Sequence, residues 1–138
     1  MSNNTTEFNN TITPSQMEEY IEMSATIGVP VLFRGCSGLG KSEIVQQVAD
    51  KMFPHRLGDN LIDIRAAGKD FADLIGLYLP SVDDNGVARN TFVPSDIWDL
   101  PEDWEGIIFL DELLNADSAV QKALYSVFLD RKIENLPL

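Results

Sequence analysis

The sequence lacks a second cysteine, a surplus of basic residues and any long apolar run, and each absence excludes a class of protein. The single cysteine, Cys36, cannot form an intramolecular disulfide. No apolar stretch approaches the roughly 20 residues of a membrane-spanning helix. The first ten residues have neither the basic start nor the apolar stretch of a secretory signal. We therefore expect a soluble, cytoplasmic protein with no membrane partner.

Basic residues are scarce throughout the chain. Ten Lys and Arg residues stand against 22 Asp and Glu residues, which gives a net charge of -12. An extended nucleic acid would meet net repulsion from such a chain, so we expect no nucleic-acid partner. With 138 residues, 44% of them apolar, the chain can bury one core but is too short for two complete domains.

The pattern of apolar residues predicts helices and strands in alternation after a flexible leader. Residues 1–12 are rich in Asn and Thr and have little to bury, which predicts that leader. Helical spacing of apolar residues predicts helices over about 13–28, 44–52 and 117–129. Short apolar runs predict strands at 29–33, 61–64 and 107–110. This order is typical of an α/β fold with a parallel sheet covered by helices.

A hairpin is predicted between the second and third of these strands. Asn85 and Gly86 lie between the apolar runs 77–82 and 87–92, and Asn-Gly in such a setting is a strong hairpin signal. Trp98 and nearby Trp104 bracket a proline-bearing loop, which we expect them to anchor by packing.

Residues 35–42 fit the pattern G-x-x-x-x-G-K-[ST] at every fixed position. The residues are Gly35, Cys36, Ser37, Gly38, Leu39, Gly40, Lys41 and Ser42. Four such positions would coincide by chance in a chain of this length on the order of once in 200. The loop also lies between a predicted strand and a predicted helix, the setting that phosphate binding requires. The sequence therefore predicts that this phosphate loop cradles a nucleotide, rather than forming a plain glycine turn.

Each part of the phosphate loop has a physical role. Gly35, Gly38 and Gly40 lack a Cβ, so their backbone N–H groups can approach phosphate oxygens closely. The helix that follows points free N–H groups and its positive dipole end at the same phosphates. Lys41 adds a positive charge toward the β and γ phosphates, and the Ser42 hydroxyl can ligate Mg²⁺.

Two carboxylates, Asp111 and Glu112, follow the apolar run 107–110 directly. In open parallel sheets, ligands bind beyond the carboxyl ends of the strands, so this acidic pair is expected beside the phosphate loop. Asp111 suits a Mg²⁺ ligand, and Glu112 suits the base that orients the attacking water. The alternative is a solvated helix start, where Asp and Glu are common. With ATP and Mg²⁺ bound, Glu112 and Lys41 would be the catalytic residues.

Two other phosphate chemistries fit the sequence less well. The stretch 73–76 matches the Asp-x-x-Gly of a GTPase by letters, but it lies in a predicted helix or loop rather than at a strand end. The base-reading Asn-Lys-x-Asp is absent from the sequence. A small-molecule kinase needs a lid carrying arginines, and the ten basic residues offer few candidates. ATP is therefore the expected nucleotide, with GTP a weak alternative.

Four segments in register resemble the MoxR-like branch of AAA+ ATPases, with phage and bacterial versions most similar. They are the phosphate loop and the stretches 61–65, 73–77 and 109–116. The resemblance covers roughly residues 14–138 and implies an ATP-driven ring, commonly a hexamer, that remodels a protein substrate, often with a von Willebrand A-type partner. It also implies that the hairpin faces the pore or substrate, and that Asn115 lies near the γ phosphate. A helix N-cap explains Asn115 equally well.

The sequence departs from this family at its end. Family members continue into a strand with the first sensor residue, an arginine finger and a helical lid, and no such segments follow residues 135–138 here. In the family's sheet that strand lies between the phosphate-loop strand and the acidic-pair strand. Its loss would leave unpaired backbone groups in a core, each costing on the order of 1 to 3 kcal/mol. We therefore expect a fragment, a truncated product, or a sheet completed by a partner or by rearrangement.

Two functions from different classes remain open at this point. In the first, residues 13–138 are the N-terminal part of an AAA+ core that binds MgATP and, when completed, hydrolyses it, with very slow turnover in the present form. In the second, the chain is a non-hydrolysing module that binds nucleotide or joins full-length rings and poisons them. Arg34 and Arg131 could meet a neighbouring ring subunit, although solvated or locally paired charges are the alternative.

Overall fold

The structure is a computed structural model that describes residues 11–35, 38–134 and 136–137. Its helices are α1 (Pro14–Ile27), α2 (Lys41–Met52), α3 (Phe71–Leu74) and α4 (Ser118–Asp130). Its strands are β1 (Leu61–Arg65), β2 (Gly76–Val82), β3 (Ala88–Pro94), β4 (Ile107–Asp111), β5 (Lys132–Ile133) and β6 (Leu136–Pro137). Three 3-10 turns, η1 (Pro54–Arg56), η2 (Asp96–Trp98) and η3 (Leu113–Asn115), connect them.

Helix α1 begins where the capping box predicts. The Gln16 N–H donates to Thr13 Oγ1 over 3.2 Å, and the Thr13 N–H donates to Gln16 Oε1 over 2.9 Å. Ile12, which the sequence placed in the expected leader, is half-buried and packs against the core cluster that contains Met17. Ile12 precedes the N-cap residue Thr13, and its contact with Met17 is a hydrophobic staple that fixes the position of Ile12. Residues 1–10 lie outside the described part of the chain.

A parallel pair of strands, β1 and β4, forms the centre of the molecule. Leu61 lies opposite Ile107 and Arg65 opposite Asp111, with the residues between them in the same register. Parallel pairing needs a crossover connection, and residues 66–106 supply it with α3 and the β2–β3 hairpin. The strands at 61–64 and 107–110 and the helices predicted at 13–28, 44–52 and 117–129 are thus confirmed, with shifts of a few residues at their ends.

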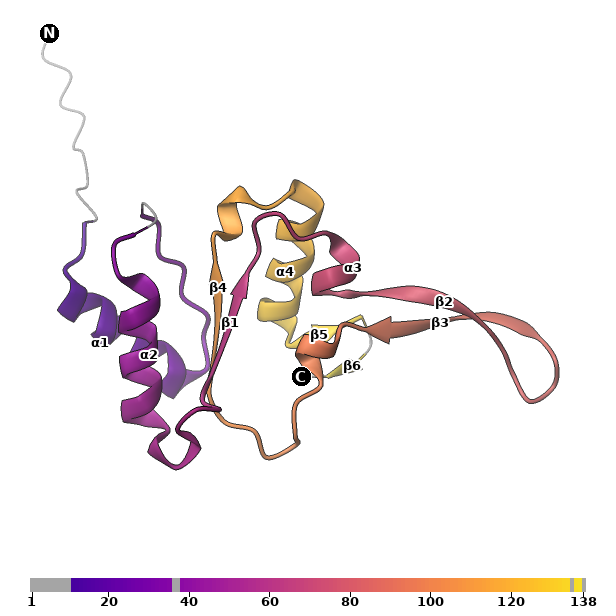
Figure 1. Ribbon diagram of the computed structural model, residues 1–138, viewed down its shortest axis with the longest axis horizontal. Coiled ribbons are helices and arrows are strands. Elements are labelled where there is room, and N and C mark those ends of the chain that lie inside the picture. Colours follow the sequence, from indigo (N-terminus) through magenta and orange to yellow (C-terminus); the bar gives the residue numbers. More distant parts are fainter. Residues whose placement is uncertain (1–10, 36–37, 135, 138) are drawn as a thin grey trace, which may run out of the picture.

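Helices cover both faces of the pair (Figure 1). On one face, α1 and α2 bury Met17, Ile21, Val45 and Val48 against side chains that include Ile107 and Phe109. On the other face, α3 and α4 enclose a second cluster, in which Leu124 is fully buried. Successive residues of a strand point to opposite faces, so β4 contributes to both clusters.

The strand predicted at 29–33 does not form. Residues 29–35 run from the end of α1 to the phosphate loop with no helix or strand assigned. A strand exists only through hydrogen bonds to a neighbour, and within the described residues β4 pairs with β1 alone. The β-branched run is present, but no strand lies next to it.

The predicted hairpin is confirmed as β2 and β3, which project away from the helices (Figure 1). Asp83 organises its turn, because the Asp83 carboxylate accepts from the N–H groups of Asn85 and Val87 and binds Arg89 Nε at 2.7 Å. Gly86 adopts φ 76°, a left-handed conformation that favours glycine.

The two tryptophans anchor loops as predicted. Buried Trp98 donates its Nε1–H to the Leu74 carbonyl at 2.6 Å, which ties η2 to α3. Trp104 donates to the Asp59 carbonyl at 2.9 Å and joins the loop before β4 to the turn before β1. Among residues 11–35, 38–134 and 136–137, none of the helices has the length and apolar character that a bilayer crossing requires.

Candidate functional site

A groove of about 1230 Å³ lies between residues 29–35 and β4. Its walls include Gly35 and Lys41 of the phosphate loop and both members of the acidic pair, Asp111 and Glu112. The two motifs, about 70 residues apart in the sequence, therefore open onto one cavity. Ser42, the other predicted Mg²⁺ ligand, is exposed on the first turn of α2.

Two glycines of the phosphate loop, Gly38 and Gly40, adopt left-handed backbone conformations. Gly38 has φ 83° and Gly40 has φ 74°, both left-handed. In this region a side chain costs energy, whereas glycine is unstrained. A Cβ added at Gly38 would meet no atom within 4 Å. The glycine there is needed for its backbone angle, and the space beside it is open. Cys36 and Ser37, also predicted to contact the nucleotide, lie outside the described residues.

Helix α2 presents an uncapped amino end at this loop. Its N-cap residue, Gly40, makes no side-chain hydrogen bond to the helix, so the first N–H groups of α2 have no such partner. The Lys41 ammonium donates to the Gly35 carbonyl over 3.0 Å and closes the loop on itself. A helix amino end together with a nearby ammonium attracts anions.

The acidic pair sits on a strained turn at the carboxyl end of β4. Glu112 has φ 55°, a left-handed angle that is rare for a residue with a side chain. Its N–H donates to Asp111 Oδ1 over 2.9 Å, which fixes the Asp111 carboxylate against the backbone of the turn. Backbone strain of this kind costs of order 1–3 kcal/mol and clusters at functional sites. Both residues are half-buried, which argues against a simple solvated helix start.

The phosphate loop and the acidic pair lie at the same edge of the structure. Strands β1 and β4 run in one direction, and their carboxyl ends lie at the same edge as the amino end of α2 (Figure 1). This arrangement is the one expected from the rule that ligands bind beyond the carboxyl ends of parallel strands. Of the predicted site residues that the structure describes, Gly35, Lys41, Asp111 and Glu112 line one groove, whereas Gly38, Leu39, Gly40 and Ser42 are not among its lining residues.

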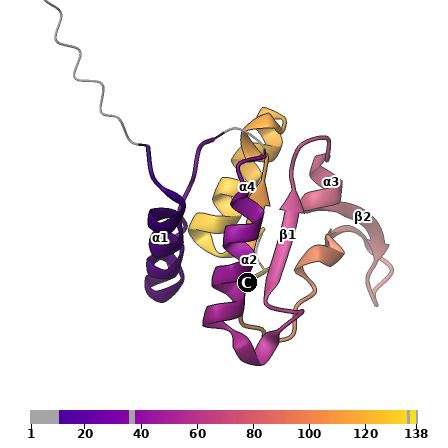
Figure 2. The ribbon, with the colours of Figure 1, turned by 60° about the vertical axis from the view of Figure 1, so that its left-hand side comes forward.

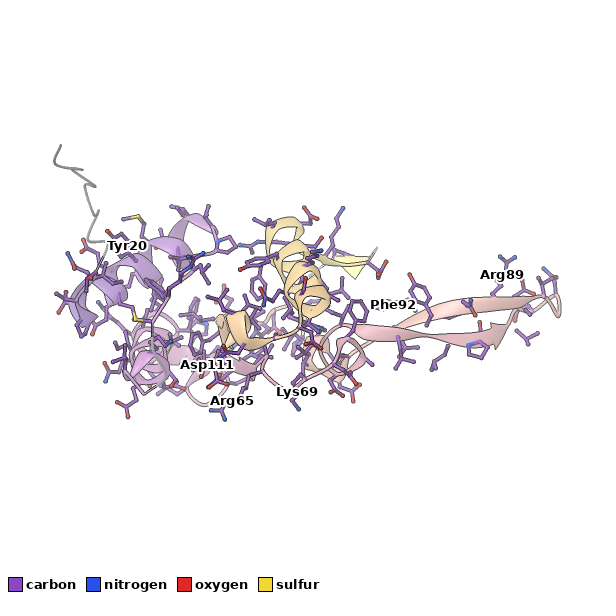
Figure 3. All side chains as sticks on the ribbon, turned by 90° about the horizontal axis from the view of Figure 1, so that it is seen from above. Tyr20, Arg65, Lys69, Arg89, Phe92 and Asp111 are labelled. Atoms are coloured by element: carbon purple, nitrogen blue, oxygen red, sulfur yellow. The ribbon has the colours of Figure 1, made fainter. Side chains whose placement is uncertain are left out.

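Sequence reasoning missed one charged residue beside this site. Asp63 on β1 points to the same face of the sheet as Asp111, because their register positions, 63 opposite 109 and 65 opposite 111, differ by two residues. Burial raises the pKa of Asp63, the Asp111 charge raises it further, and Arg65 opposes the shift. Figure 3 shows Arg65 and Asp111 in the same region. In residues 61–65 the charged residues Asp63 and Arg65 alternate with apolar ones, which indicates that both charges lie on one face of the strand. Only the pairing with β4 shows that Asp111 lies on that face too.

The structure bears on two residues near the site for which the sequence left alternatives open. Asn115 does not cap α4, whose N-cap is Asp117; it lies in η3 and lines the groove. Arg131 is locally paired, because its guanidinium donates to the Gly28 carbonyl at 2.6 Å and so links the end of α4 to the end of α1.

The oxygen ligands at this edge fit Mg²⁺. No group of three or more His, Cys, Asp or Glu side chains within the described residues could hold a metal ion. Mg²⁺ does not need such a cage, since it is commonly bound through one or two protein oxygens together with phosphates and waters. The Ser42 hydroxyl and the Asp111 carboxylate are ligands of that kind.

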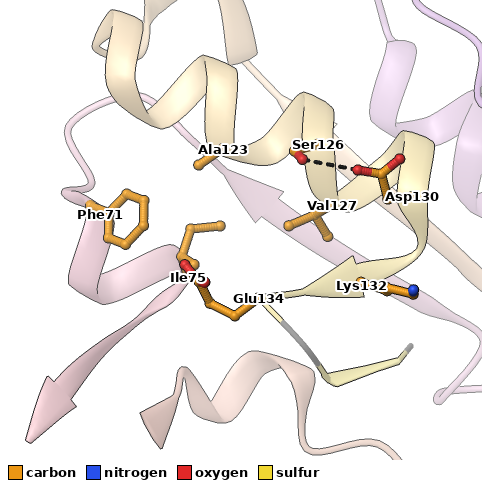
Figure 4. A pocket seen from close by; sticks show the side chains of 8 residues that line it. All are labelled: Phe71, Ile75, Ala123, Ser126, Val127, Asp130, Lys132 and Glu134. Carbon is orange, nitrogen blue, oxygen red and sulfur yellow. Dashed lines mark hydrogen bonds between the residues drawn. The ribbon is translucent and has the colours of Figure 1, made fainter. Parts of the chain in front are cut away.

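A second hollow, of about 490 Å³, lies between α3 and α4 (Figure 4). Phe71 and Ile75 give it an apolar side, while Asp130, Lys132 and Glu134 give it charges of both signs. No glycine is among its lining residues. The larger groove is therefore the better candidate for a functional site.

Comparison of the chain with protein-family models, curated proteins and solved structures found no match. What the chain does must therefore be inferred from its own residues. The described arrangement is a small α/β fold with a two-stranded parallel sheet and an antiparallel hairpin.

Proposed function

We propose that the chain is the nucleotide-binding part of an ATPase of the AAA+ type, similar to the MoxR-like branch, which binds ATP with Mg²⁺. The observation that carries this proposal is the shared groove of the phosphate loop and the acidic pair, represented in its walls by Gly35, Lys41, Asp111 and Glu112. The left-handed glycines and the uncapped amino end of α2 support it further.

Each residue has a defined task in this proposal. The backbone of residues 35–42 and the amino end of α2 hold the phosphates. The Lys41 ammonium gives up its hydrogen bond to the Gly35 carbonyl and donates to phosphate oxygens instead. Ser42 and Asp111 hold the Mg²⁺, which would neutralise charge that develops on the phosphates. Glu112 accepts a proton from the attacking water and orients it in line with the bond that breaks.

ATP is favoured over GTP by the position of Asp73. This residue lies in α3, and its carboxylate accepts from the Asp70 N–H at 3.2 Å as part of a capping box. It is therefore committed to a helix start and does not follow a strand, as the Asp-x-x-Gly of a GTPase would.

A non-hydrolysing nucleotide-binding module is the second candidate. It is favoured by the pairing of Arg131 with Gly28, which removes one of the few arginines near the groove from any role toward phosphate. Arg34 is the other arginine that lines the groove. If neither residue stabilises the transferring phosphoryl group, nucleotide binds without appreciable turnover.

The deciding experiment is phosphate release from ATP with Mg²⁺. The enzyme function predicts slow release that Glu112→Gln abolishes while binding is kept, and Lys41→Ala abolishes binding. Binding without release, even when a full-length relative is added, would establish the module instead. The ring assembly, the protein substrate and a von Willebrand A-type partner remain part of the proposal through the family resemblance. They are tested by sedimentation with and without ATP.

A further inference from the structure

The hollow between α3 and α4 is separate from the nucleotide site. Its residues on α4, at positions 123, 126, 127 and 130, recur at helical spacing and so form one face of the helix. Residues 125, 128 and 129, which line the larger groove, lie on the opposite face, and buried Val127 alone borders both hollows. Figure 2 shows α3, the other wall of the hollow, on the side of the molecule away from α1. A ligand in this hollow therefore does not occupy the nucleotide site.

One end of the hollow is apolar. Phe71 begins α3 and is 41% exposed, although the helix packs against the core. Ile75, which follows α3, belongs to the buried core cluster and shows little surface. The Phe71 ring is therefore the main apolar surface that a ligand can cover. In Figure 4, Phe71 lies at one end of the hollow, and Asp130 and Lys132 lie at the other.

The other end of the hollow carries charges of both signs that do not neutralise each other. Among the described residues, Lys132 forms no ion pair, either with Asp130 or with Glu134. The Ser126 hydroxyl donates to Asp130 Oδ2 over 3.2 Å, which orients the carboxylate. An ammonium can donate three hydrogen bonds, and a carboxylate can accept several. This end of the hollow can therefore bind an anionic and a cationic group side by side.

The segment that carries these charges is held on both sides of Lys132. Arg131 has φ 51°, and its guanidinium donates to the Gly28 carbonyl at 2.6 Å. Glu134 has φ 53°, and its carboxylate accepts from the Tyr78 hydroxyl over 3.2 Å. Left-handed angles cost energy in residues with a side chain, and they persist only where the surrounding structure fixes them. The backbone of Lys132 is thus in place before a ligand arrives, which favours binding.

We propose that this hollow binds a free α-amino acid with an apolar side chain, in its zwitterionic form. The α-carboxylate of the ligand accepts from Lys132, its α-ammonium donates to Asp130, and its side chain covers Phe71. The ligand and the hollow then match in order, with both charges at one end and the apolar part at the other. A peptide fits less well, because its two terminal charges are separated by the length of the chain.

The size and exposure of the hollow set the expected affinity. Its volume of about 490 Å³ lies within the range of small-molecule sites. Asp130 and Lys132 are exposed, so each charged contact contributes little, and we expect a millimolar dissociation constant. This proposal does not depend on nucleotide binding.

Four related ligands test the proposal. Phenylalanine carries both charges, phenylalaninamide keeps only the ammonium, and N-acetylphenylalanine keeps only the carboxylate. Glycine has the zwitterionic head without a side chain. Each is titrated into the isotope-labelled full chain, and amide shifts are followed by NMR. We expect the largest shifts at Phe71, Ala123 and Lys132. Each ligand with a single charge should bind about twofold to fivefold more weakly than phenylalanine. Glycine should bind at least about tenfold more weakly, because it covers no apolar surface.

Chain variants assign the two charged contacts. Lys132→Gln should weaken binding of phenylalanine about twofold to fivefold and leave phenylalaninamide unaffected, because the amide has no carboxylate. Lys122→Gln is the matched control, since it makes the same change at an exposed residue of α4 that does not line the hollow, and it should alter neither affinity. Asp130→Asn keeps an acceptor for Ser126; it should weaken binding of phenylalanine and leave N-acetylphenylalanine unaffected.

Four results would overturn the proposal. Phenylalanine at high millimolar concentration could leave the spectrum of a folded chain unchanged. Phenylalaninamide could bind as tightly as phenylalanine, which would make the hollow a site for cations. N-acetylphenylalanine could do so, which would make it a site for anions. Shifts confined to residues of the larger groove would place the ligand elsewhere. Binding of MgATP, titrated separately, is unaffected by any of these results.

Discussion

Replacing Gly40 by alanine tests whether the left-handed loop serves nucleotide binding. Gly40 has φ 74°, and a Cβ added there would lie 4.0 Å from Glu43 Oε2, so it would meet no clash. The cost is therefore the backbone conformation alone, about 1–2 kcal/mol. Gly86 in the hairpin turn is a matched control, because it has φ 76° and no atom within 4 Å of an added Cβ. Gly86→Ala should lower the free energy of unfolding by this amount, whereas Gly40→Ala should lower it less, because the empty loop can relax out of the left-handed region.

Only the loop variant should lose affinity for nucleotide. The alanine loop can relax out of the left-handed region when empty, and binding must then restore the strained conformation. A cost of 1–2 kcal/mol corresponds to a dissociation constant for MgATP raised by a factor of about 5–30. Gly86→Ala should bind MgATP as the unchanged chain does. Urea unfolding measures the stability of both variants, and isothermal titration calorimetry measures their affinity.

Two outcomes would refute this reasoning. If Gly40→Ala kept its affinity without losing the full amount of about 1–2 kcal/mol of stability, the loop conformation would have no part in binding. If Gly86→Ala lost affinity as well, the effect would come from general destabilisation, and the assignment of residues 35–42 as the binding loop would lose its support.

The remaining predictions concern charge, a buried hydrogen bond and strain. Burial and the Asp111 charge raise the pKa of Asp63, so ionisation of this carboxyl group opposes folding. Asp63→Asn should therefore raise the free energy of unfolding at pH 7. Urea unfolding at a series of pH values should show this gain disappear as the pH falls through the raised pKa to about 3.9. Trp98→Phe leaves the buried carbonyl of Leu74 without its donor and should cost about 1–3 kcal/mol in the same assay. Glu112→Gly should relieve the left-handed strain at φ 55° and raise the free energy of unfolding by about 1 kcal/mol. It should also abolish phosphate release. A loss of stability would show that the turn is unstrained.

Local signals in the sequence predicted the helices well. The start of α1 follows from Thr13, Pro14 and Gln16, and its end from Gly28, which adopts the left-handed C-cap conformation. These interactions lie within a few residues of one another, so the sequence contains all that is needed. The hairpin turn was predictable for the same reason, since Asp83 and Gly86 act locally.

Features that depend on distant pairing were not predictable from one sequence. The run 29–33 has the composition of a strand, but whether it becomes one depends on a neighbour. The place of Asp63 beside Asp111 depends on the register of β1 against β4. The short strands β5 and β6 were missed, and α3 was left open between helix and loop, because so few residues carry no clear periodicity.

The most direct test of nucleotide binding at the amino end of α2 is an NMR titration of the isotope-labelled chain with ATP and Mg²⁺, followed by exchange of Mg²⁺ for paramagnetic Mn²⁺. We predict that ATP shifts the amide signals of Gly38, Gly40 and Lys41 most strongly, and that Mn²⁺ broadens those of Ser42 and Asp111. A well-dispersed spectrum with no change at these amides at millimolar ATP would contradict the proposed function.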